Sequence, residues 1–217
     1  MPLPTLLRAE RRRLLTAAVV AACAAAFALP VNAQTQALTP FDLAQLMQSL
    51  AKVKAGEATF VETRTVAMLE RTLESSGRLS FEAPDTFVRE TLKPRREKIA
   101  IVGNTVTMSL GSRSRTVPLD SVPEAAVIME AIRGTLTGNR DAIERHFAAA
   151  VSGSPQRWVL ELKPREPRLR ELVISVRLTG AQSLVREVAV AMADGDRSVM
   201  AIEPVVPGAA RPASAAS

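Results

Sequence analysis

The fold is decided by residues 77–110, which read GRLSFEAPDTFVRETLKPRREKIAIVGNTVTMSL. Apolar and polar side chains alternate along this stretch, which is the period of a half-buried β-strand. The apolar positions are Leu79, Phe81, Ile99, Ile101, Val106, Met108 and Leu110. Residues typical of tight turns, such as Pro84-Asp85 and Gly103-Asn104, separate the alternating runs. Because connections this short join antiparallel neighbours, the sequence from Glu57 onward predicts an antiparallel meander of about six strands.

Strands return in the second half of the chain. The same alternation recurs in three runs, formed by Trp158, Leu160 and Leu162; by Leu172, Ile174, Val176 and Leu178; and by Val188, Val190 and Met192. The triplet Asp194-Gly195-Asp196 predicts a tight hairpin turn. Residues 198–203 then form the last predicted strand.

A helix is predicted before the first strand, over residues 39–53. Its apolar side chains fall on one stripe at helical spacing. We expect Thr39 to cap it, Pro40 to stand in its first turn and Gly56 to end it.

Two further helices are predicted between the two groups of strands. Residues 122–136 have an apolar stripe with Asp120 or Ser121 as the expected cap, and a shorter helix follows at residues 141–146. The expected fold is therefore mainly β with α: a long antiparallel sheet, curved or nearly closed, with helices on one side.

The N-terminus has the composition of a secretory signal peptide. Arginines up to Arg13 precede an apolar run at residues 14–29, and a small-residue site ends at Ala33. We expect cleavage there to release a protein that begins at Gln34 and is soluble in the periplasm. The predicted organisation is a signal peptide at 1–33, one domain at 34–206 and a disordered tail at 207–217.

Cys23 offers an alternative interpretation of the same segment. Val20-Ala21-Ala22-Cys23 resembles a lipobox, and lipidation of Cys23 would tether the chain to a membrane. Cleavage at Ala33 is favoured because the apolar run continues past Cys23. Since Cys23 is the only cysteine, such cleavage leaves no disulfide, thiol nucleophile or zinc-thiolate site.

Composition and motifs argue against several function classes. Aromatic residues make up 3% of the chain and tyrosine is absent, so no stacking platform for nucleic acid is expected. The single histidine, His146, lies on a polar helical face, and no Gly-x-Ser-x-Gly motif is present. Asp194 and Asp196 supply too few oxygens for calcium. We therefore expect no catalytic residue, metal or cofactor, and no enzyme activity.

Two features leave alternatives open. The basic run at residues 93–98 predicts a solvated turn in preference to a docking patch for an acidic partner. A curved apolar sheet under amphipathic helices is compatible with a hydrophobic binding cavity and equally with a closed core.

Several stretches together resemble one family. They are Ala58–Glu62 with its phenylalanine, Ser76–Phe81, Pro84-Asp85-x-Phe87, Lys93-Pro94 and Ile99–Val106. In order and spacing they resemble the periplasmic outer-membrane lipoprotein carrier family, LolA, over roughly residues 41–204. The resemblance is to a divergent branch of that family, in which the cargo need not be a lipoprotein.

The resemblance implies an unclosed antiparallel β-barrel covered by lid helices. It also implies a monomeric carrier that takes acylated lipoprotein or another lipid from an inner-membrane donor protein toward an outer-membrane acceptor protein. The expected cavity residues are Phe60, Leu79, Phe81, Phe87, Ile101, Val106 and Met108. The expected lid residues are Val127, Ile128 and Ile132. The alternative function is an envelope sensor or regulatory domain of the same fold that binds a protein partner.

Two positions depart from the family pattern. Ala83 stands where carriers of this family have an arginine that hydrogen-bonds to the lid, and Arg89 stands where the family often has tryptophan. Without that arginine, we expect apolar contacts alone to hold the lid.

Overall fold

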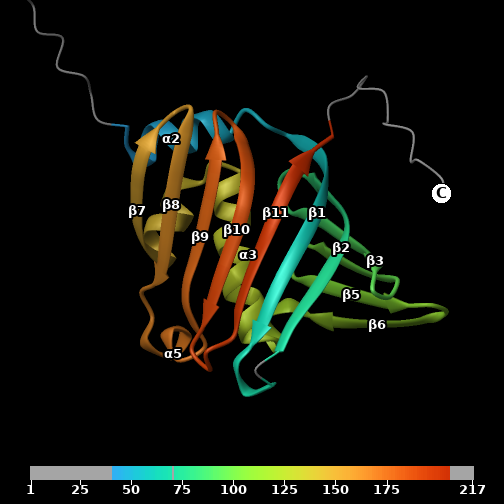
Figure 1. Ribbon diagram of the computed structural model, residues 1–217. Coiled ribbons are helices and arrows are strands. Elements are labelled where there is room, and N and C mark those ends of the chain that lie inside the picture. The colour runs from blue at the N-terminus through green and yellow to red at the C-terminus, as the bar shows by residue number, and fades with distance from the viewer. Residues whose placement is uncertain (1–40, 70, 206–217) are drawn as a thin grey trace, which may run out of the picture. The chain divides into compact units, whose positions relative to one another are not determined.

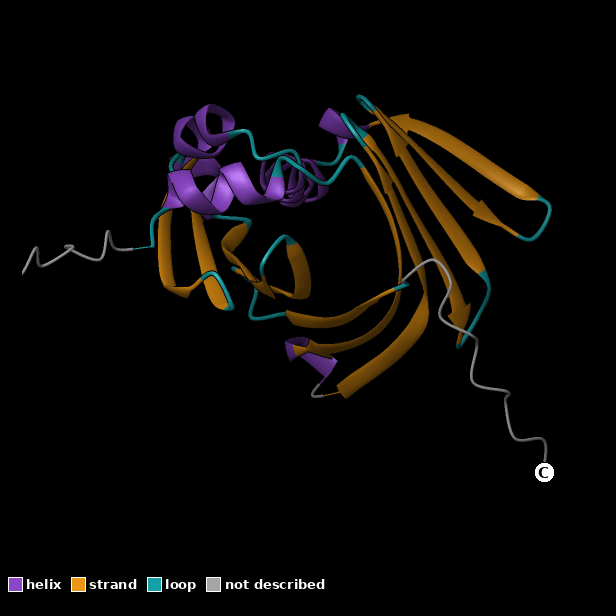
Figure 2. Ribbon diagram, turned by 90° about the horizontal axis from the view of Figure 1, so that it is seen from above, coloured by secondary structure: helices purple, strands orange, loops and turns teal. Residues whose placement is uncertain are grey.

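One large antiparallel β-sheet dominates the computed structural model, which describes residues 41–69 and 71–205 (Figure 1). Helices lie against one face of the sheet, and the sheet curves around them (Figure 2). The predicted signal peptide, Cys23 and the predicted tail at 207–217 lie outside the described residues.

The sheet contains eleven strands in the order β6-β5-β4-β3-β2-β1-β11-β10-β9-β8-β7. The first six are β1 Ala55–Val66, β2 Arg71–Glu82, β3 Thr86–Lys93, β4 Glu97–Val102, β5 Thr105–Leu110 and β6 Arg113–Pro118. The others are β7 Phe147–Ser154, β8 Arg157–Pro164, β9 Val173–Ala181, β10 Leu184–Met192 and β11 Arg197–Pro204. Among the described strands β6 and β7 each have one neighbour, so the sheet is an unclosed barrel, as expected. The six-strand meander is confirmed.

Strand β7 is an element that the sequence did not predict. It reads FAAAVSGS, and its small residues give little of the β-branched and aromatic character that identifies strands. Its pairing with β8 and the contacts of Phe147 in the core place it at the edge of the sheet. Likewise unexpected is the short helix α5, Pro167–Arg170, between β8 and β9.

The alternation predicted for β9 is broken at its start. Ser175 pairs with Ala191, whereas Met192 pairs with Val173, so Ile174 is an extra residue on β9. This β-bulge reverses the side-chain direction. As a result Val173 is fully buried and Ile174 is 51% exposed, the opposite of the prediction.

Helix α2 spans Leu43–Leu50 and is shorter than predicted. The prediction of Thr39 as its cap was wrong: Asp42 is the cap, and its carboxylate accepts a hydrogen bond from the Gln45 N–H at 2.9 Å. Gly56 does not end the helix, because it already lies in β1.

Helices α3, Pro123–Leu136, and α4, Arg140–His146, confirm the two helices predicted between the strand groups. Neither Asp120 nor Ser121 caps α3. Both belong to a 3-10 turn at Leu119–Ser121, where the Ser121 hydroxyl donates to the Pro118 carbonyl. Gly138, at φ +64°, follows the end of α3 in the left-handed conformation that glycine adopts without strain. No helix in the described part of the chain is long and apolar enough to cross a membrane.

Candidate functional site

The strand register puts all seven predicted cavity residues on one face of the sheet, which we call the inner face. Phe81 pairs with Phe87, Phe87 with Ile101, and Ile101 with Val106. Leu79 pairs with Ala58, two residues from Phe60, and Met108 lies two residues beyond Val106. Paired residues of antiparallel strands point to the same side. The helices cover this same face (Figure 2).

Two apolar clusters of unequal size lie on the inner face. The large core joins α2, α3 and α4 to strands β7–β10, and its fully buried members include Leu46, Ile143, Phe147, Trp158, Leu160, Leu162, Val173 and Val176. The small core lies over β3–β6 and has only Phe87, Ile101, Val106 and Leu119 as buried members. The apolar side chains over β7–β10 are therefore covered much more completely than those over β3–β6.

Helix α3 bridges the two cores. Of the predicted lid residues, Val127 and Ile128 contact the large core and Ile132 contacts the small core. Leu136, at the end of the helix, packs against both. The structure therefore places the three predicted lid residues on a helix over the inner face, and their role as a lid stays a prediction.

Between the two cores the inner face is only partly covered. Half-buried apolar side chains line this zone, which we call the open strip. Leu79 and Met200 lie in its middle, Phe81 borders the small core, and Val188, Val190 and Ile202 border the large core. Toward the β6 edge Met108 is 38% exposed and Leu110 is 40% exposed, although both point to the inner face. Apolar surface of this kind is available to an apolar ligand.

A charged network lies within this apolar face. Arg89 of β3 forms an ion pair with Glu62 of β1, and its guanidinium stands 4.7 Å from the centre of the Phe60 ring. Glu62 also accepts hydrogen bonds from the hydroxyls of Ser75 and Ser198. The network thus ties together β1, β2, β3 and β11. The sequence showed Arg89 only as a departure from the family pattern, because its partners Ser75, Glu62 and Phe60 lie 14 to 29 residues away along the chain.

The network keeps Glu62 ionised. Burial raises the pKa of this carboxyl, but the hydrogen bond from Ser198, the charge of Arg89 and the hydrogen bonds from Arg89 and Ser75 together leave its pKa below the ordinary value of 4.5. Within the described residues, Arg89 Nε and the Thr91 hydroxyl, both buried, have no hydrogen-bond partner. Burying these charges costs free energy that offsets much of their attraction, so the ion pair is weak evidence for stability.

Helix α3 is fastened to the sheet by a hydrogen bond as well as by apolar contacts. Arg133 donates from Nη2 to the carbonyl of Gly103, in the turn between β4 and β5, at 2.7 Å. The expectation that apolar contacts alone hold the lid was therefore wrong. In the family pattern the arginine stands on the sheet, at the position of Ala83. Here the donor, Arg133, is on the helix and the acceptor, the Gly103 carbonyl, is on the sheet. Sequence reasoning missed it because helical spacing does not show which turn a long side chain reaches.

A second ion pair fixes the predicted hairpin turn at residues 194–196. Asp196 accepts from Arg64 at 2.8 Å and from the Ala67 N–H at 3.0 Å, while its own N–H donates to Asp194. Two hydrogen bonds lower the pKa of the Asp196 carboxyl: the one from Arg64 has the larger effect and the one from the Ala67 N–H the smaller. These contacts confirm the turn and give both aspartates structural partners.

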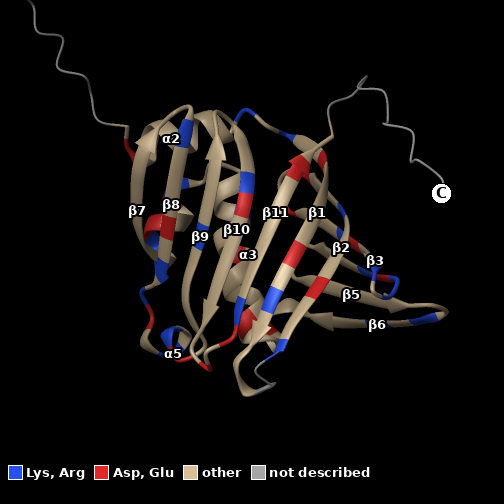
Figure 3. Ribbon diagram, viewed as in Figure 1, with Lys and Arg blue, Asp and Glu red and all other residues tan. Residues whose placement is uncertain are grey.

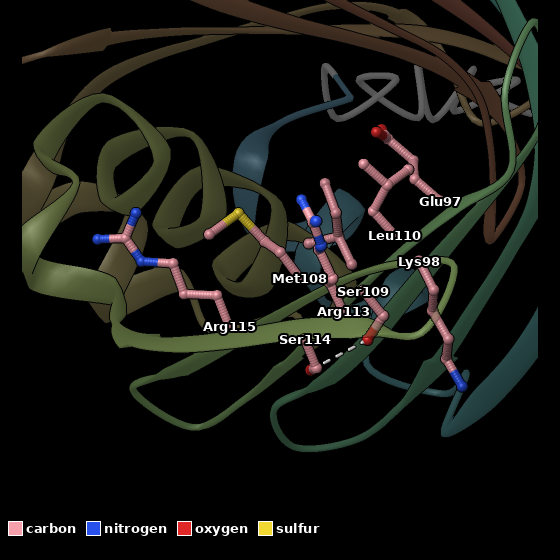
Figure 4. A pocket seen from close by; sticks show the side chains of 9 residues that line it. Glu97, Lys98, Met108, Ser109, Leu110, Arg113, Ser114 and Arg115 are labelled. Atoms are coloured by element: carbon pink, nitrogen blue, oxygen red, sulfur yellow. Dashed lines mark hydrogen bonds between the residues drawn. The ribbon is translucent and has the colours of Figure 1, made fainter.

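Two hollows lie at the margins of the sheet. One, of about 320 Å³, is lined by residues of β4, β5 and β6 at the free edge (Figure 4). The other, of about 550 Å³, is on the outer face near Ala148, Lys163 and Ile174. Among residues 41–69 and 71–205 no group of three or more His, Cys, Asp or Glu side chains has the arrangement of a metal site.

Comparison with known proteins gives one match to a family. The family model described as outer membrane lipoprotein carrier protein LolA-like matches residues 33–217. A comparison with curated proteins gives no match.

Solved structures resemble the chain only distantly. A LolA superfamily protein from Nitrosomonas europaea has 9% identity and a TM-score of 0.43 over 75% of this chain and 92% of its own. LprF from Mycobacterium bovis has 10% identity and a TM-score of 0.35 over 74% and 91%. A putative outer membrane lipoprotein-sorting protein domain from Vibrio parahaemolyticus has 11% identity and a TM-score of 0.40 over 78% and 92%.

Proposed function

Since the chain belongs to the family of LolA-like outer membrane lipoprotein carrier proteins, we propose that it shelters acyl chains on its inner face and carries them through the periplasm toward the outer membrane. The cargo is a lipoprotein or another acylated lipid. An inner-membrane donor protein supplies it, an outer-membrane acceptor protein receives it, and the carrier acts as a monomer without catalysis. The chain is exported, and cleavage of the signal peptide near Ala33 leaves it soluble in the periplasm.

The observation that carries the proposal is the open strip. Its apolar side chains are half-buried although they lie on the face that the helices cover. A chain of sixteen carbons costs on the order of 12 kcal/mol to leave in water, at about 0.8 kcal/mol per methylene. A carrier must offset this cost and still release its cargo, so it needs apolar surface that the fold itself does not fully bury.

Binding of a fluorescent fatty acid to the purified mature protein tests the proposal. We expect saturable binding, and we expect native mass spectrometry of protein purified from its own periplasm to show bound lipid. Leu79→Glu, which puts a charge in the open strip, should weaken binding at least tenfold, because it raises the polarity of the surface on which the chain lies.

Val61→Glu is the matched control. Val61 is on β1, is 56% exposed and points to the outer face, so its substitution adds the same charge away from the proposed site. Circular dichroism of each variant establishes that it is folded. Equal loss in both variants, or no binding by the unaltered protein, would contradict the proposal.

A further inference from the structure

The hollow at the free edge of the sheet combines apolar and cationic side chains. It has a volume of about 320 Å³, and its lining includes Glu97, Ile99, Met108, Leu110, Arg113 and Arg115. Figure 4 shows Met108, Leu110, Arg113 and Arg115 on one side of the strands. On the opposite side, Ser109 and Ser114 form a hydrogen bond. The two sides of the β5–β6 hairpin therefore differ in chemistry.

The apolar part of the hollow is continuous with the inner face. Ile99 pairs with Met108, and Ile99 also packs against the small core. Met108 and Leu110 remain 38% and 40% exposed at the end of this row. An acyl chain that lies on the small core can therefore extend along Ile99 to Met108 and Leu110 without leaving apolar surface.

The cations stand directly opposite these apolar residues. Arg115 pairs with Met108 and Arg113 pairs with Leu110, so both arginines point to the inner face from the edge strand. Both are exposed, and in the part of the chain that the structure describes neither has a carboxylate within 4.0 Å. Glu97 lines the same hollow without pairing to either. Other basic residues gather at the neighbouring β3–β4 turn (Figure 3).

We propose that this hollow binds the head of an anionic amphiphile, with its phosphate or carboxylate on Arg113 and Arg115 and its acyl chain on Ile99, Met108 and Leu110. The proposal rests on the proposed carrier function and narrows its cargo to lipids with an anionic head. Guanidinium groups bind phosphate and carboxylate through paired, charge-assisted hydrogen bonds. The apolar side chains beside them distinguish such a lipid from a free anion, which gains nothing from Met108 and Leu110.

The test compares two single-chain lipids of equal chain length by isothermal titration calorimetry. One is a lysophosphatidic acid, with a phosphate head, and the other is a monoacylglycerol, with a neutral head; both are used below their critical micelle concentrations. We expect the phosphate lipid to bind about tenfold more tightly or better. Because exposed charges are screened, this preference should shrink as salt is raised.

Variants then assign the preference to the hollow. Arg113→Gln with Arg115→Gln should abolish the preference and leave binding of the neutral lipid unchanged. The matched control is Arg177→Gln with Arg186→Gln, which removes the same charge from exposed positions on β9 and β10 and should preserve the preference. Met108→Glu should weaken binding of both lipids.

Three outcomes would overturn the inference. If both lipids bound with equal affinity, the protein would not select the head group. This inference would then be wrong, and the proposed carrier function would remain. Binding of inorganic phosphate as tightly as the phosphate lipid shows an anion site to which the apolar residues contribute nothing. If the protein bound neither lipid, both the proposed carrier function and this inference would be wrong.

Discussion

The two halves of the sheet differ in how completely their inner face is covered. Over β7–β10, the side chains of Trp158, Leu160 and Leu162 have no exposed surface, and three helices pack on them. Over β1–β6, Leu79 and Phe81 are half-buried and Met108 is 38% exposed. The same backbone architecture thus supports a closed core at one end and apolar surface with little cover at the other. We interpret the first as the source of stability and the second as the surface for cargo.

The largest expected effect tests the closed half. Trp158 is fully buried, and its indole N–H donates to the Gln182 carbonyl at 3.0 Å. Trp158→Ala should lower the free energy of unfolding by about 3–5 kcal/mol, because it leaves a large cavity. Phe81→Ala, in the open strip, should cost clearly less and weaken fatty-acid binding more. Urea denaturation and probe titration of both variants measure this. A greater stability loss for Phe81→Ala would contradict the division of roles.

An intermediate effect is expected at the contact between helix α3 and the sheet. Arg133→Met removes the hydrogen bond to the Gly103 carbonyl, which should cost about 1.5–3 kcal/mol as a bond from a charged donor. Hydrogen exchange should rise in α3 and at the turn between β4 and β5. Apparent affinity for a fluorescent fatty acid should rise as well, because a less stable closed state competes less with cargo.

Arg140→Met is the control for this variant. Arg140 lies on α4, is 51% exposed at its side chain and pairs with Glu144 on the surface, so its loss should change stability much less than the loss of Arg133. If Arg133→Met left exchange in α3 unchanged, the hydrogen bond would not be what holds the helix.

The smallest expected effect is a change in pH dependence. The pKa of Glu62 is lowered in the folded protein, so its contribution to stability is present above pH 4.5 and is lost as the pH falls below that value. In Glu62→Gln this contribution is absent at every pH. The stability difference between the two proteins, measured by urea denaturation, should therefore be larger at pH 7 than at pH 3.5. If the stability difference between the unaltered protein and Glu62→Gln were the same at both pH values, an ionised Glu62 would not contribute to stability.

Sequence periodicity predicted what depends on local pattern. Alternation grouped Leu79 with Phe81, Ile99 with Ile101 and Val106 with Met108, because a strand has a side-chain period of two. The strand register then shows that these groups share one face of the sheet. The same rule failed at Ile174, since a β-bulge adds a residue that the sequence does not mark.

Long-range polar contacts could not be predicted in this way. Glu62 meets Ser198 across 136 residues, and the partner of Arg133 is a backbone carbonyl that carries no sequence information. Gly77 is another case: a Cβ there would lie 1.9 Å from the Glu90 oxygen and 2.9 Å from the Phe60 ring. The need for glycine becomes clear only when β2 is seen between its two neighbours, β1 with Phe60 and β3 with Glu90.

Photo-crosslinking with a fatty acid that carries a diazirine near its chain end locates the surface on which the acyl chain lies. The probe is bound to the unaltered mature protein, irradiated, and its attachment sites are mapped by peptide mass spectrometry. We expect adducts on inner-face residues of the β1–β6 half, such as Leu79, Phe81 and Met108. Adducts confined to outer-face residues such as Val61 and Val102, or to the closed half around Trp158, would contradict it.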